Sequence, residues 1–269
     1  MYKASIIISI YNNVQALQAV LNSLKLQTEK NFEIIISEDA EHKHVREFCK
    51  TYPFENDYQH LTQPDIGWRK NKALNNAIKA AQSDWLIFID GDCVLHPQFI
   101  EQHLLLSGVQ NIVAGKRIKL NETLSKLLLA DVNNYKIIEK EITKDLLTGQ
   151  RKGNAFLEEG IFISPNSWLG FIPRMRKMHQ LKGCNMSFSK TAIEAINGFD
   201  EDYILPAIGE DIDLTWRFEA AGYHLVSARN LAIEYHLYHK ENWSDQSGNI
   251  LMMNQKKKIN EYYCLHGLK

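Results

Sequence analysis

The chain has 269 residues, of which 45% are hydrophobic and 23% are charged, the proportions of a globular protein able to bury a full core. This composition excludes an intrinsically disordered chain, and a single α/β domain with one long sheet can reach this length. The 31 basic and 32 acidic residues give a formal net charge of −1. This balance argues against nucleic acid or an anionic membrane as the main partner, so we expect charge-driven binding to be local.

The four cysteines indicate a reducing compartment. Cys49, Cys93, Cys184 and Cys264 lie far apart in the sequence without a Cys-x-x-Cys pair. This spacing is more typical of reduced, partly buried thiols than of disulfides or a zinc site. The first residues lack the apolar stretch of a signal peptide, and no run reaches the ~18 apolar residues of a membrane span. We therefore expect a cytoplasmic protein without a transmembrane segment.

The first 120 residues alternate between strand-like and helix-like periodicity. Residues 5–10 form a continuous apolar run typical of a parallel strand buried on both faces. Asn12 or Asn13 can then cap a helix whose apolar positions extend from Val14 to Leu24. Such units repeat, which predicts a mostly parallel, Rossmann-like sheet flanked by helices. Further strands are expected at 32–37, 58–61, 85–89 and 112–118, and further helices at 41–51, 70–81 and 97–107.

The pattern changes after residue 120, where we expect an elaborated second half of the same domain. From 121 to 147 the apolar positions recur at helical spacing, which predicts a helix packed on the sheet. Residues 149–182 are irregular and rich in Gly, Pro and basic side chains, so they are the best candidate for a mobile active-site or acceptor loop. A strand at 186–189, a helix at 211–221, two short strands and a charged C-terminal helix complete the expected order.

Polar segments follow three of the predicted strands, at the edge where parallel sheets bind their ligands. They are residues 9–12, Glu38-Asp39 and Asp90-Gly91-Asp92. In the third segment, two carboxylates separated by glycine can turn toward one cation while Gly91 allows close approach. Such oxygen ligands suit Mg²⁺ or Mn²⁺ that also binds the phosphates of a nucleotide. A surface turn is the alternative interpretation, because Asp-Gly is a common turn pair.

These motifs resemble, in order, those of family 2 glycosyltransferases of the GT-A fold. Residues 5–13 resemble the family's opening strand and turn, and residues 32–39 resemble its second strand, whose terminal acid contacts uracil. Asp90-Gly91-Asp92 matches the Asp-x-Asp motif that holds the metal and the donor diphosphate. Glu210-Asp211, followed by Trp216, resembles the acid pair that supplies the catalytic base in the galactosyltransferase-like C-terminal half. The resemblance runs through most of the chain.

The resemblance implies that residues 1–120 bind the nucleotide sugar. Asp39 is expected to contact the base, Asp92 to be the principal metal ligand and Asp90 to contact ribose or metal. Gly91 lies between the two metal-site acids. Together the residues expected at the nucleotide or donor are Ser9, Tyr11, Asn12, Asp39, Arg69, Lys70, Asn75, Asp90, Gly91, Asp92 and Asn185.

One position departs from the family pattern. Related enzymes usually have an Arg-Asn pair in the third helix, where this chain has Leu74 and Asn75. Phosphate or uracil contacts are therefore expected from Arg69, Lys70 or Lys72. The alternative is that these residues are solvated charges on the first turn of a helix.

The resemblance also implies that residues 121–269 bind the acceptor and supply the base. Inverting transfer needs a base within hydrogen-bond reach of the acceptor hydroxyl, and Asp211 is expected to fill that role while Glu210 orients the acceptor. The alternative is that both acids complement a helix dipole. Trp216, Gly183 and Asn185 are expected on the acceptor and sugar side, where Gly183 permits close approach and Asn185 bonds sugar hydroxyls.

A histidine is implied as a further metal ligand. His236 and His239 both lie near the position at which the family places one, and His239 is the preferred candidate with His236 as the alternative. Imidazole is a more natural ligand for Mn²⁺ than for Mg²⁺. The expected cofactor is therefore Mn²⁺, with Mg²⁺ as the alternative.

These expectations imply an inverting, metal-dependent glycosyltransferase. It would move a hexose or N-acetylhexosamine from a UDP-sugar to a saccharide or lipid-linked saccharide acceptor, in polysaccharide or glycoconjugate synthesis. A nucleotidyltransferase is the rival enzyme, but it needs a Gly-rich basic loop that Tyr11-Asn12-Asn13 does not provide. An inactive nucleotide-sugar-binding scaffold is the non-enzymatic rival. Basic residues at 174–182 and 256–258 could contact a lipid-linked acceptor or the inner face of the membrane.

Overall fold

The central layer is a seven-stranded sheet. The computed structural model describes residues 1–206, 208–209, 211–240 and 245–269, so Glu210 lies outside the described residues. The strands of the central sheet are β1 (Ala4–Ile10), β2 (Phe32–Glu38), β3 (Tyr58–Leu61), β4 (Trp85–Asp90), β6 (Asn111–Ala114), β8 (Asn185–Ser189) and β9 (His224–Ser227). A smaller, three-stranded sheet consists of β5 (Cys93–Leu95), β10 (Glu234–His236) and β7 (Ile118–Lys119).

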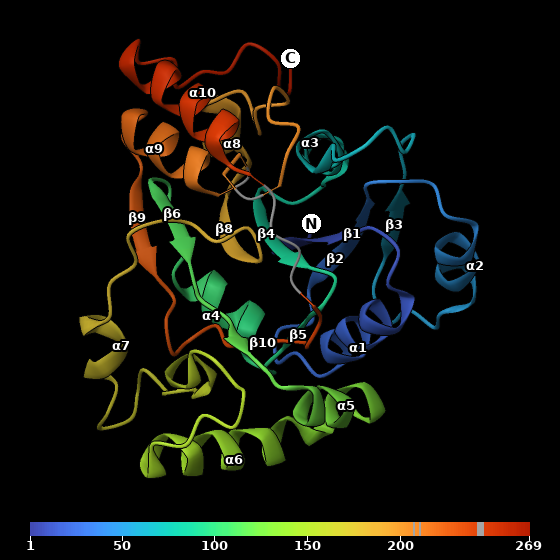
Figure 1. The fold of residues 1–269 in the computed structure, drawn as a ribbon, viewed down its shortest axis with the longest axis vertical. Coiled ribbons are helices and arrows are strands. Elements are labelled where there is room, and N and C mark those ends of the chain that lie inside the picture. The colour runs from blue at the N-terminus through green and yellow to red at the C-terminus, as the bar shows by residue number, and fades with distance from the viewer. Residues whose placement is uncertain (207, 210, 241–244) are drawn as a thin grey trace.

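The order of the central strands is β3-β2-β1-β4-β8-β6-β9 (Figure 1). Among these strands, β8 alone runs antiparallel to its neighbours. The predicted mostly parallel α/β sheet is therefore confirmed. Because β2 and β4 lie on opposite sides of β1, the strand order reverses at β1, and such a switch point opens a crevice at the carboxyl ends of the strands.

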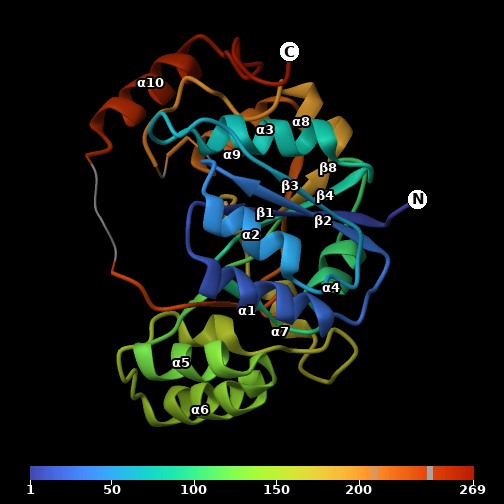
Figure 2. The same cartoon turned by 90° about the vertical axis from the view of Figure 1, so that its right-hand side faces the viewer.

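Helices cover both faces of this sheet (Figure 2). Alternate strand residues supply the two cores: Ile7 packs toward one face, and Ile6 and Ile8 toward the other. Leu17 and Val45 extend the core on the Ile6 face. That face is covered by α1 (Val14–Lys25), α2 (Lys43–Thr51) and α4 (Phe99–Leu105), and the opposite face by α3 (Lys70–Ala80), α8 (Lys190–Ala195) and α9 (Ile212–Ala220), with α10 (Ser247–Lys258) beyond them.

The predicted strand at 112–118 is wrong in extent. β6 ends at Ala114, and Ile118 begins β7 in the smaller sheet. The chain leaves the central sheet at Gly115, whose N–H donates to the Asn185 carbonyl at 2.9 Å. A Cβ at Gly115 would lie 2.4 Å from the Asn185 side chain, so the close approach that ends the strand requires glycine.

The single helix predicted from 121 to 147 is also wrong. The segment forms α5 (Glu122–Ala130), a 3₁₀ turn (Val132–Asn134) and α6 (Tyr135–Thr148). Asp131 interrupts it, because this residue is extended and its side chain accepts the Asn133 N–H in place of the helical bond. The two helices pack against the smaller sheet through a core that includes Leu128, Ile142 and Tyr235.

Residues 149–182 are mostly irregular, with a 3₁₀ turn (Leu157–Gly160) and α7 (Phe171–Met175). Their basic character is partly neutralised inside the protein, because Arg176 pairs with Glu159 at 2.9 Å. In the C-terminal helix Lys256 is buried and pairs with Asp200 and Asp202, so the three-lysine run is not one exposed patch. Across the described residues, no helix is both long and apolar enough to cross a membrane.

Candidate active site

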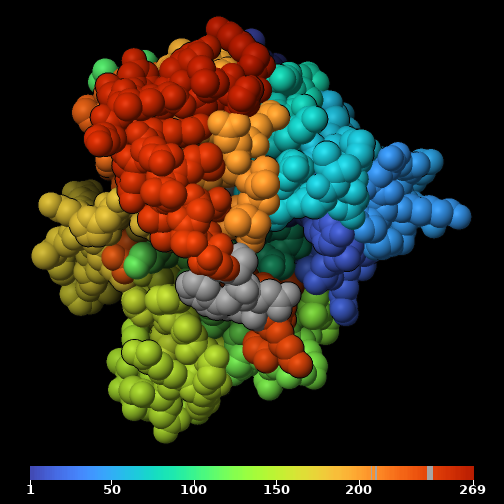
Figure 3. Space-filling view, turned by 45° about the horizontal axis from the view of Figure 1, so that its top comes forward, coloured from blue at the N-terminus to red at the C-terminus, as the bar shows by residue number. Residues whose placement is uncertain are grey.

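A cleft of about 500 Å³ opens at the carboxyl ends of β1, β2 and β4. This position is the switch point of the sheet order. Figure 3 shows the face on which the blue and cyan N-terminal segments border orange and red segments of the second half. The cleft is lined by Ser9, Ile10, Tyr11, Asn12, Asn13, Asp39, Asp65, Gly67, Trp68, Lys70, Asp90, Gly91, Asp92 and His239.

The floor of the cleft is the junction between β1 and β4. Ser9 lies opposite Asp90 in the parallel register, and the Gly91 N–H donates to the Ser9 carbonyl at 2.7 Å. A Cβ on Gly91 would lie 3.0 Å from that carbonyl, so glycine allows the close approach inferred from the sequence. The turn therefore holds Asp90 and Asp92 at the edge of the sheet.

Asp39 lies at the end of the cleft next to β2. Its carboxylate accepts hydrogen bonds from the Arg69 backbone N–H at 2.8 Å and from the Gln63 amide at 2.6 Å. Burial raises the pKa of Asp39 despite these two donors. At the same end the Tyr11 hydroxyl donates to Asp65 at 2.8 Å. Hydrogen-bonding groups and an aromatic ring thus meet where a nucleobase could bind.

Two cations face Asp90. The Lys70 ammonium lies 2.8 Å from one carboxylate oxygen and the Arg117 guanidinium 3.3 Å from the other. Both cations are partly buried, and Lys70 lines the cleft. Arg69, in contrast, directs its guanidinium to the Trp68 carbonyl. Arg117 was not anticipated, because it lies in the connection between two strands of different sheets and no local pattern marks it.

Asp92 faces two histidines. One of its oxygens lies 3.3 Å from His239 Nε2 and 3.6 Å from His236 Nε2, and the two Nε2 atoms are 3.2 Å apart. The hydrogen bond with Asp92 raises the pKa of His239 to about 9. Burial opposes ionisation of Asp92, but the hydrogen bond from His239 and neighbouring charges lower its pKa to about 2. Burial lowers the pKa of His236 to about 4.

This cluster fits a divalent cation. The Asp92, His236 and His239 ligand atoms all lie within 4.8 Å of one another. The raised pKa of His239 indicates that the Asp92 carboxylate stabilises positive charge here. One oxygen and two nitrogen ligands suit Mn²⁺ and leave further positions open. The sequence offered the two histidines as alternatives, whereas the structure brings both to Asp92.

Asp211 immediately precedes α9 and is the N-cap residue of that helix. Its side chain is 14% exposed and lies 3.9 Å from the Lys182 ammonium. Burial raises the pKa of Asp211, against the opposing effects of Lys182 and the Gly183 backbone N–H. The positive charge of Lys70, which lines the cleft, also lowers the pKa of Asp211, so Asp211 lies near the cleft. The Gly183 backbone is thus beside Asp211.

Two asparagines predicted to contact the donor are turned into the protein. Asn185 is fully buried, and its amide donates to the Lys116 and Ala232 carbonyls while its oxygen bonds to His103. Asn75 is also fully buried and bonds to the Phe199 backbone through both its amide and its oxygen. Their hydrogen-bonding groups are used in packing, so these two interpretations are corrected.

Trp216 packs beneath α10 rather than lining the cleft. Its indole donates to Asp213 at 2.9 Å, and the same carboxylate accepts the Tyr203 hydroxyl at 2.9 Å and pairs with Arg217 at 3.2 Å. Asp213 and Arg217 are both fully buried. A Cβ on Gly209 would lie 2.2 Å from Tyr203, so this glycine serves the same packing. The structure therefore places Trp216 in a buried polar network.

The sheet order, its switch point and the acid-lined cleft define a GT-A fold, and solved structures support this assignment. A mannosyltransferase from Pyrobaculum calidifontis, PcManGT, in complex with GDP-Man and Mn²⁺, matches with a TM-score of 0.58 at 14% identity, over 96% of this chain and 64% of that chain. S. aureus TarS 1-349 in complex with UDP-GlcNAc matches with a TM-score of 0.55 at 14% identity, over 89% and 60% of the two chains.

The chain belongs to glycosyl transferase family 2, whose sequence pattern matches residues 5–151, more than half of the protein. Residues 173–240 match a second pattern, described as the N-terminal domain of galactosyltransferase. Chondroitin synthase of Escherichia coli is 24% identical over 96% of this chain and 39% of its own length. The EpsH putative glycosyltransferase of Bacillus subtilis is 32% identical over 39% of this chain and 30% of its own length. The chain thus spans well under half of both relatives.

Proposed function

We propose that the protein is an inverting, metal-dependent glycosyltransferase that uses a UDP-sugar. It would transfer a hexose or N-acetylhexosamine to a saccharide or lipid-linked saccharide, in polysaccharide or glycoconjugate synthesis. The observation that carries this proposal is the convergence of Asp39, Asp90, Asp92 and His239 in one cleft at the switch point. This proposal assigns donor binding to residues 1–120 and acceptor binding and the base to residues 121–269.

The cleft offers distinct groups to the two ends of a nucleotide diphosphate. Asp39 and Tyr11 lie at the proposed nucleobase end, where a carboxylate already ordered by Arg69 and Gln63 can accept the base N–H. At the other end Lys70 supplies positive charge for the phosphates. Because the Lys70 ammonium is paired with the Asp90 carboxylate, it would exchange this partner for a donor phosphate when the donor binds.

Asp92, His236 and His239 are the residues that would hold Mn²⁺ or Mg²⁺. Such an ion would neutralise charge that develops on the departing diphosphate. Besides holding the ion, the three side chains would form one edge of the donor site. Two imidazoles favour Mn²⁺ over Mg²⁺.

Asp211 is the proposed base. Its pKa is raised by burial, which brings the carboxylate closer to the range in which it can accept a proton from an acceptor hydroxyl. Lys182 and the Gly183 N–H keep it anionic and oriented. The proton of the acceptor hydroxyl passes to Asp211 as the oxygen attacks the anomeric carbon opposite the diphosphate. Glu210, outside the described residues, is proposed to orient the acceptor.

The relatives support this assignment at different levels. Chondroitin synthase aligns over nearly the whole chain, which favours a saccharide acceptor, and TarS is described with UDP-GlcNAc, which favours UDP. PcManGT is described with GDP-Man and Mn²⁺, which favours the metal but offers a different nucleotide. We also propose a cytoplasmic location, with the inner face of the membrane as the alternative that suits a lipid-linked acceptor.

The test is nucleotide release from a panel of UDP- and GDP-sugars with Mn²⁺, with and without saccharide acceptors. We expect acceptor-stimulated release from a UDP-sugar, abolished by a chelator and restored by Mn²⁺. Binding of every donor without turnover would favour an inactive scaffold, and release of pyrophosphate from a nucleoside triphosphate would favour a nucleotidyltransferase. Retention of the anomeric configuration in the product would contradict inversion.

A further inference from the structure

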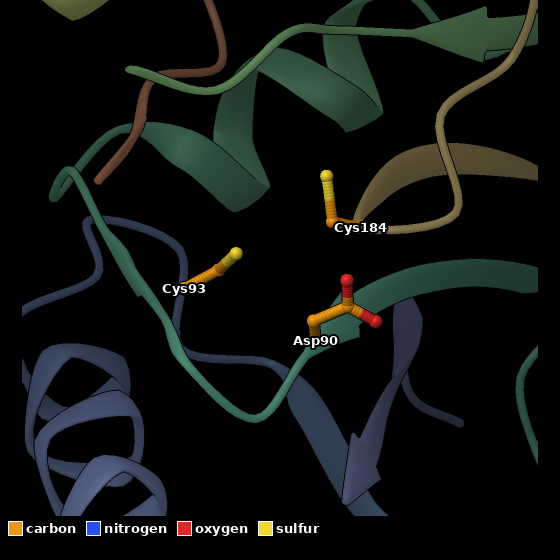
Figure 4. A group of neighbouring side chains, drawn as sticks. All are labelled: Asp90, Cys93 and Cys184. Carbon is orange, nitrogen blue, oxygen red and sulfur yellow. The ribbon is translucent and has the colours of Figure 1, made fainter. Parts of the chain in front are cut away.

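Two buried thiols lie directly behind the donor cleft. Cys93 on β5 and Cys184 before β8 come within 4.8 Å of each other and of an Asp90 carboxylate oxygen, measured between their potential ligand atoms (Figure 4). Figure 4 shows Asp90 and Cys93 on the two sides of one turn and Cys184 on a separate segment, with the three side chains around a common space. All four cysteines of the chain are free and buried, but Cys49 and Cys264 belong to no such cluster among the described residues.

An unexplained acid lies next to these thiols. Glu234 is fully buried, and neither of its carboxylate oxygens has a hydrogen-bond partner. In the antiparallel pairing of β10 with β5, His236 lies opposite Cys93, so Glu234, two residues earlier, is on the same face of the sheet. Burial, and next the neighbouring Cys184, raise the pKa of Glu234 well above its ordinary value. A buried carboxylate without a partner is costly unless a cation binds it.

We propose that Cys93, Cys184 and Asp90 form a second metal site, selective for a thiophilic divalent cation such as Zn²⁺ or Cd²⁺, with Glu234 as a nearby fourth residue. Sulfur ligands select such cations, whereas the cluster of Asp92 with two imidazoles suits Mn²⁺. The two sites lie on either side of Gly91 and share no ligand. The second site goes beyond the proposed function, in which Asp92, His236 and His239 hold the metal.

The charges permit this occupancy. Binding replaces the two thiol protons, which pass to solvent, so two thiolates form as one divalent cation enters. With Asp90 ionised, the two thiolates and this carboxylate give the cluster three negative groups. Arg117 lies 3.3 Å from Asp90, and together with the divalent cation it matches the charge of these three groups.

Asp90 gives the cation a route into the buried site. The thiols are at most 4% exposed, but Asp90 lines the cleft and is 22% exposed at its side chain. A cation that enters the cleft thus meets Asp90 first and the thiols behind it. Since Asp90 also pairs with Lys70 at 2.8 Å, occupancy would weaken that ion pair.

The test is a Cd²⁺ titration of the reduced chain, with reductant removed, followed by the ultraviolet thiolate-to-cadmium charge-transfer absorption. We expect saturation at one cation per chain. Cys93→Ser and Cys184→Ser should each raise the dissociation constant at least about 100-fold, since loss of a direct ligand exceeds the effect of losing its support. Cys49→Ser and Cys264→Ser, which alter equally buried cysteines, should keep the wild-type curve.

Asp92→Ala separates this site from the cleft site, and the variant should retain the thiolate absorption. Absence of absorption in the wild type, or its persistence in both Cys93→Ser and Cys184→Ser, would overturn the proposal. If a serine variant fails to fold, cadmium NMR of the wild type decides: a shift typical of two sulfur ligands supports the site, and a shift typical of oxygen and nitrogen ligands alone refutes it. Neither readout requires glycosyl transfer.

Discussion

The cleft at β1 and β4 and the buried network around α9 both contain a pair of acids two residues apart, but the pairs behave differently. Asp90 and Asp92 follow a strand, and both line the cleft. Asp211 and Asp213 begin a helix, and only Asp211 lies near the cleft, since Asp213 is fully buried against Arg217. In a parallel sheet, the polar residues at the carboxyl ends of the strands lie at the same edge. Residues two positions apart on a helix, in contrast, point in different directions around the helix axis.

The largest effect is expected from Asp92→Ala, which removes the carboxylate of the proposed Mn²⁺ site. Metal-dependent transfer should fall at least about 10,000-fold, because both donor affinity and leaving-group stabilisation depend on the ion. Steady-state nucleotide release and calorimetric Mn²⁺ binding measure this. Glu47→Ala, an exposed acid on α2, is the control. Near-native transfer by Asp92→Ala would remove this residue from the metal site.

Asp211→Asn should reduce kcat about 1,000-fold while donor affinity remains, because it removes the base without emptying the donor site. The measurement is a kcat and KM comparison, together with UDP binding in the presence of Mn²⁺. Glu219→Gln, an exposed acid on the same helix, controls for the loss of helix charge. A native rate would move the base to another residue, and a parallel loss of UDP affinity would place Asp211 in the donor site.

Arg217→Met should act on stability instead of chemistry. It leaves the buried Asp213 carboxylate without its cation, so the free energy of unfolding should fall by about 3–5 kcal/mol. Denaturant unfolding measures this loss, and UDP binding by the folded fraction should stay unchanged. Asp213 retains hydrogen bonds from Tyr203 and Trp216, so a loss below this range would show that those two donors compensate.

The smallest effect is expected from Asn185→Ala, which tests whether this buried side chain serves packing and not donor binding. Its loss leaves two buried carbonyls and His103 with fewer partners, so stability should fall by about 1–3 kcal/mol. Because the side chain is buried, the donor KM should not change. A large rise in donor KM with unchanged stability would instead place Asn185 at the sugar.

Much of the fold and the cleft could be predicted from local pattern. The apolar run of β1, the Asn13 cap of α1 and the acids after β2 and β4 are short-range features that the structure contains at the expected positions. The roles of Asn75, Asn185 and Trp216 could not be predicted from local pattern. Amide and indole groups bond equally well to a sugar or to a backbone carbonyl, and only their three-dimensional neighbours distinguish the two.

By itself the sequence determined the α/β class, most of the succession of strands and helices in the first half and the acids that line the cleft, because periodicity and strand ends are local properties. Tertiary structure alone decided that both His236 and His239 reach Asp92, that Arg117 faces Asp90, and that Cys93 meets Cys184. These groups come from segments up to 147 residues apart, as the positions of Asp92 and His239 show. The packing of the two sheets brings these distant residues together, and no local sequence pattern predicts that packing.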